Sequence, residues 1–409
     1  MTQLFKSCSY LSDDKVPGLK SYGELNPPSR LLLGPGPSNV DPRVLKAMVS
    51  PLVGHLDPYF FEIMNETVEL LRYAFKTNNK LTIPVSGTGS AGMEAALYNT
   101  VEPGDEVVVG MNGYFGERMN EIASRCGGKV IGIKEDWGKV VRKEAVEDAL
   151  KKSKAKVVAI VHAETSTGAL QPLHEISKVA HEYGALLLVD AVTSLTGCEL
   201  DVDALQIDVC YSGSQKCLNC PPGLSPITFN EKAMNKVLAR NTKVPSWYLD
   251  MSLIEKYWSE GRAYHHTAPI SMIYALREAL RIVYEEGLEK RWARHKKNSQ
   301  AFIEGIEAMG LKMHAEKEHR LPSLNSVAIP TGVTDTNVRS TLLNDFNIEV
   351  GGGLGALRGK IWRVGLMGIN SNEKTVIIAL EALERALRKE GYKVTAGEGV
   401  RAAADFFSK

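Results

Sequence analysis

The amino-acid sequence predicts an α/β protein with a large, mostly parallel seven-stranded sheet and a smaller C-terminal α/β unit. From about residue 81, short runs rich in β-branched residues alternate with amphipathic helical stretches, which is the pattern of a wound sheet. A long helical stretch at residues 271–309 ends this alternation, and a second, shorter one follows it. We therefore predict an N-terminal arm at residues 1–30, a large domain at 31–285 and a small domain at 286–409.

The expected elements of both units follow from their residue spacing. Runs of β-branched and apolar residues bounded by turn residues predict strands at 81–86, 106–110, 129–133, 156–161, 185–190, 207–212 and 224–229. Apolar residues three and four apart predict helices at 92–100, 117–126, 143–152 and 173–183. In the smaller unit we expect strands near 326–329 and 361–364 and helices near 336–346 and 374–389. The segment before Pro35 has no clear pattern, and the tail 394–409 is either a docked helix or frayed.

Composition excludes several classes of protein. The chain has 409 residues, with 49 Lys and Arg against 48 Asp and Glu, so its net charge is +1 and creates no field for nucleic acid or an anionic membrane. A content of 44% hydrophobic and 24% charged residues is that of a globular protein. The apolar runs are far shorter than the roughly 20 residues that cross a bilayer. With no signal-peptide core and no C-terminal peroxisomal tripeptide, we expect a cytoplasmic protein without nucleic-acid or membrane partners.

Six cysteines are too few and too irregularly spaced for a disulfide scaffold. Cys217 and Cys220 have the spacing of half a zinc site or of a redox pair. No second pair and no histidine at ligand spacing follows them. We therefore expect reduced thiols and no metal site.

A glycine-rich turn, Gly-Thr-Gly-Ser-Ala-Gly at residues 87–92, lies between a predicted strand and a predicted helix. The free N–H groups and the positive end of the dipole at a helix N-terminus suit a phosphate. The same letters match the dinucleotide motif, which also needs an acidic residue at the end of the next strand. That strand ends in Val109-Gly110-Met111-Asn112 without one. An NAD-dependent oxidoreductase is therefore a weaker alternative, and a tight turn without a ligand is another.

An aspartate and a lysine follow two later strands. Asp190 ends a strand of the predicted sheet, where ligands bind, although it could also serve only as a helix cap. Lys216 comes after the next strand and a small polar turn, and residues 217–223 carry no charge, which predicts that the lysine is buried. A buried amine has a lowered pKa and can act as a nucleophile.

A phosphate-binding turn, a strand-end aspartate and a buried lysine are together the groups that hold pyridoxal 5′-phosphate. The helix N-terminus would neutralise the phosphate, Asp190 would keep the pyridine nitrogen protonated, and Lys216 would attach to the aldehyde. A protonated ring is an electron sink, which transamination requires.

The chain resembles the alanine–glyoxylate and serine–pyruvate aminotransferases, which are class V aminotransferases of fold type I. The resemblance covers nearly the whole chain in eight blocks that follow the family order: 33–39, 86–89, 164–168, 189–190, 212–216, 264–267, 352–355 and 362–365. It implies the fold of a type I pyridoxal-phosphate-dependent transferase and a homodimer as the active unit.

The resemblance also implies the roles of individual residues. Lys216 would carry the cofactor and transfer the proton, and Asp190 would pair with the pyridinium. The residues expected to contact the cofactor are Thr88, Gly89, Ser90, Phe115, Thr165 and Gln215, together with Tyr264 and Thr267, which would reach the phosphate of the neighbouring subunit. Arg363 would bind the substrate α-carboxylate, because a guanidinium fork fits a carboxylate, and Gly36 would be a second substrate-binding residue.

We predict an aminotransferase that moves the amino group of L-alanine or L-serine to glyoxylate, giving pyruvate or hydroxypyruvate and glycine. Phe115 stands where many relatives have Trp, and Ser90 where some have His, so the cavity lining leaves the substrate preference open. A kynurenine-type or ureidoglycine–glyoxylate aminotransferase is therefore the nearest alternative. A non-catalytic pyridoxal-phosphate-binding protein lies outside the class. A cysteine desulfurase is disfavoured because no cysteine follows residue 220.

Overall fold

Seven strands form the central sheet of the larger unit in the computed structural model, which describes residues 22–409. The strand order is β2 (Leu81–Ser86), β10 (Leu224–Phe229), β9 (Val209–Tyr211), β8 (Leu186–Asp190), β5 (Val157–Val161), β3 (Glu106–Met111) and β4 (Lys129–Lys134). Strand β10 runs antiparallel to both of its neighbours, and the other strands pair in parallel. This confirms the predicted sheet.

The sequences of the inner strands explain why they lie at the centre. Every residue of β5 and β8 is buried, as expected for parallel strands that are covered on both faces. The edge strand β4 has no fully buried residue and carries two exposed lysines. Helices connect the strands: α3 (Gly89–Thr100), α4 (Tyr114–Arg125), α5 (Lys143–Lys151), α6 (His174–Glu182) and α7 (Glu231–Leu238).

Two of these helices begin three residues earlier than the apolar spacing predicts. Helix α3 begins at Gly89 rather than at residue 92, and α4 begins at Tyr114 rather than at 117. The first turns contain small, polar and aromatic residues that do not show the apolar period, so the pattern starts only one turn into each helix. Because α3 begins at Gly89, both Gly89 and Ser90 lie in its first turn.

The other helices of the larger unit begin at recognisable caps or follow a glycine break. Helices α1 (Pro42–Met48) and α2 (Pro58–Phe75) each follow an Asp-Pro pair, whose carboxylate accepts a backbone N–H of the first turn at 2.8 Å. Both pack against α9 (Ile270–Glu286), and α8 (Met251–Trp258) precedes it. The predicted helical stretch at 271–309 is two helices, α9 and α10 (Leu288–Ala308), because Gly287 between them has φ +83.

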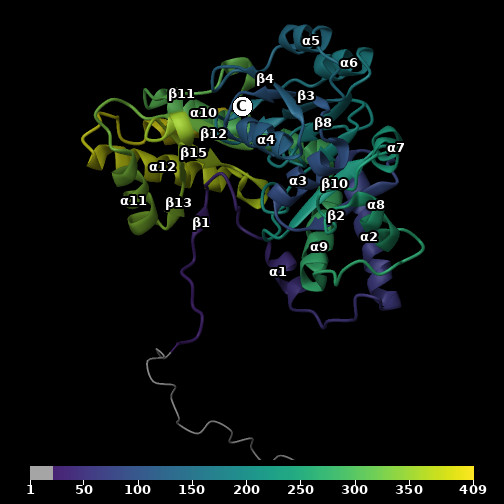
Figure 1. Ribbon diagram of the computed structural model, residues 1–409. Coiled ribbons are helices and arrows are strands. Elements are labelled where there is room, and N and C mark those ends of the chain that lie inside the picture. The colour runs from purple at the N-terminus through teal and green to yellow at the C-terminus, as the bar shows by residue number, and fades with distance from the viewer. Residues whose placement is uncertain (1–21) are drawn as a thin grey trace, which may run out of the picture.

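The smaller unit lies to the left of the large sheet in Figure 1. Its antiparallel sheet has the order β11 (Lys312–Met313), β12 (Leu324–Ala328), β15 (Ile361–Gly365) and β14 (Gly351–Gly352). Helices α10, α11 (Asp335–Phe346) and α12 (Glu373–Lys389) contribute to its core. Three short 3₁₀ turns complete this part at Lys317–His319, Gly355–Leu357 and Gly368–Asn370.

The N-terminal segment joins both units. Its strand β1 (Leu31–Leu32) pairs in parallel with β13 (Ile348–Glu349), so that Leu33 is buried in the core of the smaller unit. The chain then continues into α1 of the larger unit. Residues 1–21 of the predicted arm lie outside the described residues, and the predicted domain bounds stay predictions.

The C-terminal tail forms α13 (Glu398–Phe407), which packs against α10 and α12, with Ala403 fully buried. Of the two alternatives, the tail is thus a docked helix. Within residues 22–409, no helix combines the length and the apolar character needed to cross a membrane. The cytoplasmic location stays a prediction.

Gly305 of α10 should control how closely α13 docks. A Cβ atom there would lie 2.8 Å from the carbonyl oxygen of Gly399 and would also collide with the Leu380 side chain. Gly305→Ala is expected to destabilise the protein by about 1–3 kcal/mol through overpacking, although alanine favours a helix by about 1 kcal/mol.

Urea unfolding followed by circular dichroism measures this loss, and limited proteolysis should show earlier cleavage in residues 394–409. Gln300→Ala, on the exposed face of the same helix, is the control and should change stability by less than about 0.5 kcal/mol. An alanine variant at Gly305 that is as stable as the wild type would show that α13 docks less tightly than described.

Candidate active site

A cavity of about 140 Å³ lies at the carboxyl ends of the parallel strands of the large sheet. Residues from β5, β8, the first turns of α3 and α4, and the loop after β9 line it. Eight of the predicted site residues are among them: Thr88, Gly89, Ser90, Phe115, Thr165, Asp190, Gln215 and Lys216. The sheet thus brings together residues from five separate parts of the chain.

Asp190 is held by its neighbour on the adjacent strand. Asp190 and Tyr211 lie opposite each other in the parallel β8–β9 register, and the Tyr211 hydroxyl donates to Asp190 Oδ2 at 2.7 Å. The backbone N–H of Val192 donates to Oδ1 at 2.8 Å. Burial raises the pKa of the Asp190 carboxyl to about 6, against the effect of these two hydrogen bonds. The carboxylate therefore faces the cavity in a fixed orientation.

Lys216 is buried, with 8% of its surface exposed, and its Nζ donates to the carbonyl oxygen of Pro35. Burial, together with the nearby positive charge of Arg363, lowers the pKa of the amine to about 8. Gly36 lies against this side chain: it has φ +112, and a Cβ there would lie 2.7 Å from Lys216 Nζ. Only glycine allows the N-terminal segment to pass so close to the amine.

The first turn of α3 and Gln215 line one corner of the cavity. Thr88 is the N-cap of α3, and its side chain makes no capping hydrogen bond, so the first N–H groups of the helix have no partner within it. Gln215 Oε1 is buried and has no hydrogen-bond partner among the described residues. Free donors at a helix N-terminus bind oxyanions such as phosphate.

Glu164 organises the opposite wall, and we did not single it out from the sequence. It is fully buried, and its Oε2 accepts the backbone N–H groups of Phe115 and Gly116 at 3.2 Å each. Its Oε1 accepts the N–H and the hydroxyl of Ser166 at 3.0 and 2.6 Å. Burial raises its pKa to about 7. The carboxylate thereby ties the start of α4, and with it Phe115, to the turn that carries Thr165.

Arg118 is a second lining residue that the sequence analysis missed. Its guanidinium lies 5.1 Å from the centre of the Phe115 ring and donates to Ser90 Oγ at 3.3 Å. It follows Phe115 by three residues, which places both side chains on one face of α4. This spacing was the available signal. Arg118 adds a positive charge beside the first turn of α3.

Arg363 approaches the cavity from the smaller unit. It lies in the middle of β15, between Ser326 of β12 and Gly351 of β14, and is 6% exposed. Its Nε donates to the carbonyl oxygen of Gly352 at 2.8 Å, and its Nη1 donates to that of Thr165 at 3.3 Å. Burial lowers its pKa to about 10, while the charge of Glu164 raises it.

Tyr264 and Thr267 do not line the cavity of their own chain. Both are exposed, and the Tyr264 ring lies 5.5 Å from that of His55. Between them, His266 Nε2 and Ser86 Oγ are 2.9 Å apart. Burial lowers the pKa of His266 to about 4, so its ring is neutral and links this loop to the end of β2.

The cysteines near Lys216 are small core residues. Cys217 and Cys220 are buried and free, and burial raises the pKa of the Cys217 thiol to about 11. In the part of the chain that the structure describes, no three His, Cys, Asp or Glu side chains gather as metal ligands.

Tyr211→Phe tests how Asp190 is held. The pKa of Asp190 in the folded protein lies above its ordinary value of 3.8, so stability falls as the pH rises through the window from 3.8 to about 6. The Tyr211 hydrogen bond favours the ionised form. Removing it raises this pKa further and extends the fall in stability to higher pH.

The expected loss of stability in Tyr211→Phe is about 1–3 kcal/mol at about pH 8, where Asp190 is ionised, and much smaller at about pH 5. Urea unfolding at both pH values measures it. Tyr98→Phe is the control, because the Tyr98 hydroxyl makes no hydrogen bond among residues 22–409. An equal loss at both pH values would mean that the hydroxyl does not act through the Asp190 charge.

Comparison with known proteins places this arrangement in a family. The family described as Aminotransferase class-V matches residues 31–373. Alanine–glyoxylate aminotransferase of Rattus norvegicus is 43% identical over 368 residues, which are 89% of each chain. The structure of alanine–glyoxylate aminotransferase from Nostoc sp. has a TM-score of 0.89 and 53% identity, covering 90% of this chain and 98% of that one. Ureidoglycine–glyoxylate aminotransferase from Bacillus subtilis has a TM-score of 0.93 and 43% identity, covering 95% and 100%.

The residues of the cavity fit the cofactor of this family, pyridoxal 5′-phosphate. The free N–H groups in the first turn of α3 suit the phosphate, Asp190 suits a protonated ring nitrogen, and Lys216 suits the aldehyde. The aromatic side chain of Phe115 supplies a surface on which a ring can stack. The fold, the cavity and the relatives lead to one conclusion: the chain belongs to the class V aminotransferases and is a pyridoxal-phosphate-dependent enzyme of fold type I.

Proposed function

We propose that this enzyme transfers the amino group of L-alanine or L-serine to glyoxylate, giving pyruvate or hydroxypyruvate and glycine. The observation that carries the proposal is that Arg363 lies beside the buried Lys216, close enough for its charge to lower the pKa of the amine. A carboxylate bound to the guanidinium would bring the substrate Cα next to the base.

Lys216 and Asp190 are proposed as the catalytic pair. When bound, the cofactor supplies an electron-withdrawing ring that stabilises negative charge at the substrate Cα. Because burial lowers the pKa of Lys216 to about 8, part of the amine is uncharged near neutral pH and can accept a proton at Nζ and return it. Asp190, oriented by Tyr211 and Val192, would hold a proton on the ring nitrogen.

The remaining site residues are proposed to bind and orient. Thr88, Gly89, Ser90 and Gln215 would bind the phosphate, Phe115 would stack on the ring, and Thr165 would contact the ring oxygen. Arg363 would grip the α-carboxylate, with its Nη1 leaving the Thr165 carbonyl to do so. Gly36 would keep the wall of the substrate site close to Lys216.

We further propose a homodimer in which Tyr264 and Thr267 of each subunit reach the phosphate site of the other. Tyr264 is 63% exposed in its own chain, so its side chain is accessible to a second subunit. Other large apolar side chains are also exposed. They are Leu45 of α1, three residues between α1 and α2 (Val49, Leu52 and Leu56), and two residues before α8 (Trp247 and Tyr248). Burial of such a surface against a second copy would stabilise the pair.

A ureidoglycine–glyoxylate aminotransferase is the second candidate. Its support is the likeness to the Bacillus subtilis enzyme of that name, which is 43% identical and covers 95% of this chain. Both candidates share glyoxylate as the acceptor and differ in the donor.

Visible absorption of the holoenzyme distinguishes these donors. L-alanine, L-serine, L-kynurenine and (S)-ureidoglycine are added singly, and glyoxylate follows. Loss of the cofactor band with L-alanine or L-serine, restored by glyoxylate, is the expected result. A cycle seen only with (S)-ureidoglycine would favour the second candidate, and no change with any donor would refute both.

Lys216→Ala should remove this spectral cycle and lower turnover by at least 10²–10⁴-fold, since that is roughly the contribution of a positioned base. Lys178→Ala on the exposed surface of α6 is the matched control and should cycle normally. Ordinary turnover in Lys216→Ala would exclude the proposed role of the amine.

A further inference from the structure

Three distant segments of the chain meet at Asn219, three residues after Lys216. The Asn219 Nδ2 atom lies 3.0 Å from Ser38 Oγ and 3.3 Å from the carbonyl oxygen of Met367. Its Oδ1 accepts the backbone N–H of Ile369 at 2.8 Å. Asn219 therefore connects the loop that carries Lys216 with the N-terminal segment and with the 3₁₀ turn Gly368–Asn370, which follows Arg363 and β15.

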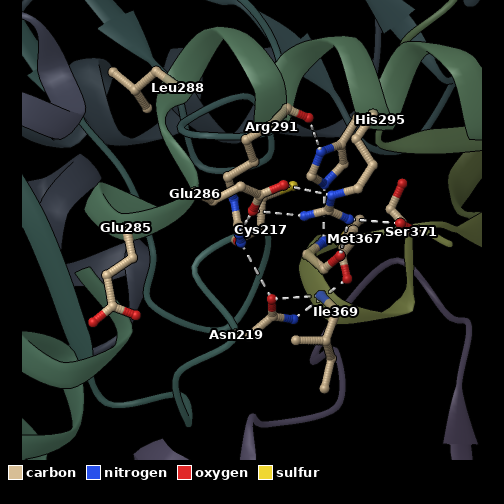
Figure 2. Close-up of polar contacts among 12 residues, drawn as sticks. Cys217, Asn219, Glu285, Glu286, Leu288, Arg291, His295, Met367, Ile369 and Ser371 are labelled. Carbon is tan, nitrogen blue, oxygen red and sulfur yellow. Dashed lines mark hydrogen bonds and ion pairs between the residues drawn. The ribbon is translucent and has the colours of Figure 1, made fainter. Parts of the chain in front are cut away.

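A buried arginine of α10 completes this contact (Figure 2). Arg291 is 2% exposed, donates to the carbonyl oxygen of Cys217, and donates to Asn219 Oδ1 at 3.3 Å. Its counter-ion is Glu286, at 2.6 Å from Nη1. The cation thus lies between α10 and the loop after Lys216, where it pairs with the buried carbonyl oxygen of Cys217 and the buried amide oxygen of Asn219.

The same helix also holds the other side of the contact. Arg294 donates to the carbonyl oxygens of Gly368 and Ser371 at 2.7 and 2.6 Å. His295 Nε2 accepts the N–H of Gly368 at 2.9 Å, while its Nδ1 lies 2.7 Å from the carbonyl oxygen of Arg291. We call the set of Asn219, Glu286, Arg291, Arg294, His295 and the turn Gly368–Asn370 the Asn219 junction.

The two sides of the junction touch without space between them. Gly368 has φ +56, and a Cβ at this position would collide with Asn219 Oδ1. Asn219 itself has φ +53, a conformation that asparagine adopts more readily than most residues. Both residues are in the left-handed conformation, and both are hydrogen-bonded to α10. The loop after Lys216 and the turn Gly368–Asn370 therefore have little freedom to move relative to each other.

We propose that Asn219 and Arg291 are positioning residues that fix the Lys216 loop against the turn after Arg363 and so set the separation of the amine and the guanidinium. Lys216 lies three residues before Asn219, and Arg363 lies four residues before Met367. Ser38 strengthens the tie, because its Oγ donates to the carbonyl oxygen of Lys216 at 2.8 Å. The inference rests on the proposed roles of Lys216 and Arg363.

The junction affects catalysis through the distance between the Lys216 amine and a carboxylate bound to Arg363. Proton transfer at Cα requires the amine and the bound carboxylate to keep their mutual geometry, and an error of about 1 Å can cost on the order of 10²-fold in rate. Among the described residues, the side-chain hydrogen bonds of Asn219 and Arg291 end on neither Asp190 nor the first turn of α3. Ser38 also donates to the carbonyl oxygen of Gln215 at 3.3 Å. Loosening the junction should therefore slow the reaction of the donor far more than it weakens cofactor binding.

Asn219→Gly removes the side chain and retains the left-handed backbone without strain. Asn347→Gly is the matched control, since Asn347 has φ +57 and caps α11 on the surface. In the holoenzyme we expect Asn219→Gly to lower the rate of the spectral change with L-alanine or L-serine on the order of 10²-fold. The affinity of the apoenzyme for pyridoxal 5′-phosphate should fall by far less than the rate, and the control should match the wild type in both.

Arg291→Lys gives a second test that retains the charge but loses the fork. Arg240→Lys is its control, because Arg240 also donates to two acceptors, the backbone carbonyls of Asn99 and Val101, at the end of α3 far from Thr88. We expect Arg291→Lys to slow the donor reaction and to raise hydrogen exchange of residues 216–220 and 366–371 together. Asn219→Asp, which keeps the acceptor oxygen, should retain part of the rate and replaces Asn219→Gly if that variant does not fold.

The outcomes separate the junction from the proposed function. Variants that react with the donor at the rate of their controls, or that lose cofactor affinity in the same proportion as rate, would overturn the inference. If the wild-type holoenzyme exchanges no amino group with these donors and glyoxylate, the proposed function fails instead. In that case hydrogen exchange tests the junction by itself: exchange that rises together in residues 216–220 and 366–371 of Arg291→Lys supports it, and exchange that is unchanged in either segment contradicts it.

Discussion

The amine of Lys216 and the guanidinium of Arg363 lie in surroundings that water hardly reaches, with 8% and 6% of the two residues exposed. Burial disfavours charge, which lowers the pKa of both bases and raises that of the carboxyls of Asp190 and Glu164. The two carboxyls are held mainly by N–H and O–H donors, not by ion pairs with these bases. A site arranged in this way keeps several groups poised to change protonation near neutral pH, and the rest of the structure maintains that state.

The architecture maintains it by closing the cavity with parts of the chain that are far apart in sequence. The large sheet provides Asp190 and the loop of Lys216 at the carboxyl ends of its strands. The small sheet provides Arg363, and the N-terminal segment lays Gly36 over the lysine after pairing with β13. The side chain of Asn219, in the loop that carries Lys216, bonds to both the N-terminal segment and the turn after β15 and so joins these three parts. Displacing any of them would admit water, and the pKa of Lys216 would return toward its ordinary value.

The sequence was sufficient for the elements whose residues carry a regular pattern. Buried strands such as β5 and β8 are recognised from their apolar runs, and the strand ends led directly to Asp190 and Lys216. Hydrogen-bond partners that depend on the order of the strands could not be predicted from the sequence. Tyr211 meets Asp190 only because β9 pairs with β8, and Glu164 acts through the start of α4, which the apolar period places one turn too late. The two-residue strands β1 and β13, and the meeting of Asn219 with Gly368, depend on packing between distant segments and leave no local signal.

The central claim is that burial makes Lys216 the nucleophilic amine of this cavity, and reductive trapping tests it most directly. The cofactor-free protein is incubated with pyridoxal 5′-phosphate at a series of pH values, reduced with borohydride, and mapped by peptide mass spectrometry. The account predicts attachment at Lys216 with a midpoint near pH 8, and a higher midpoint in Arg363→Leu because a neighbouring positive charge is removed. Attachment mainly at other lysines, or a midpoint at the ordinary lysine value of 10.5, would contradict it.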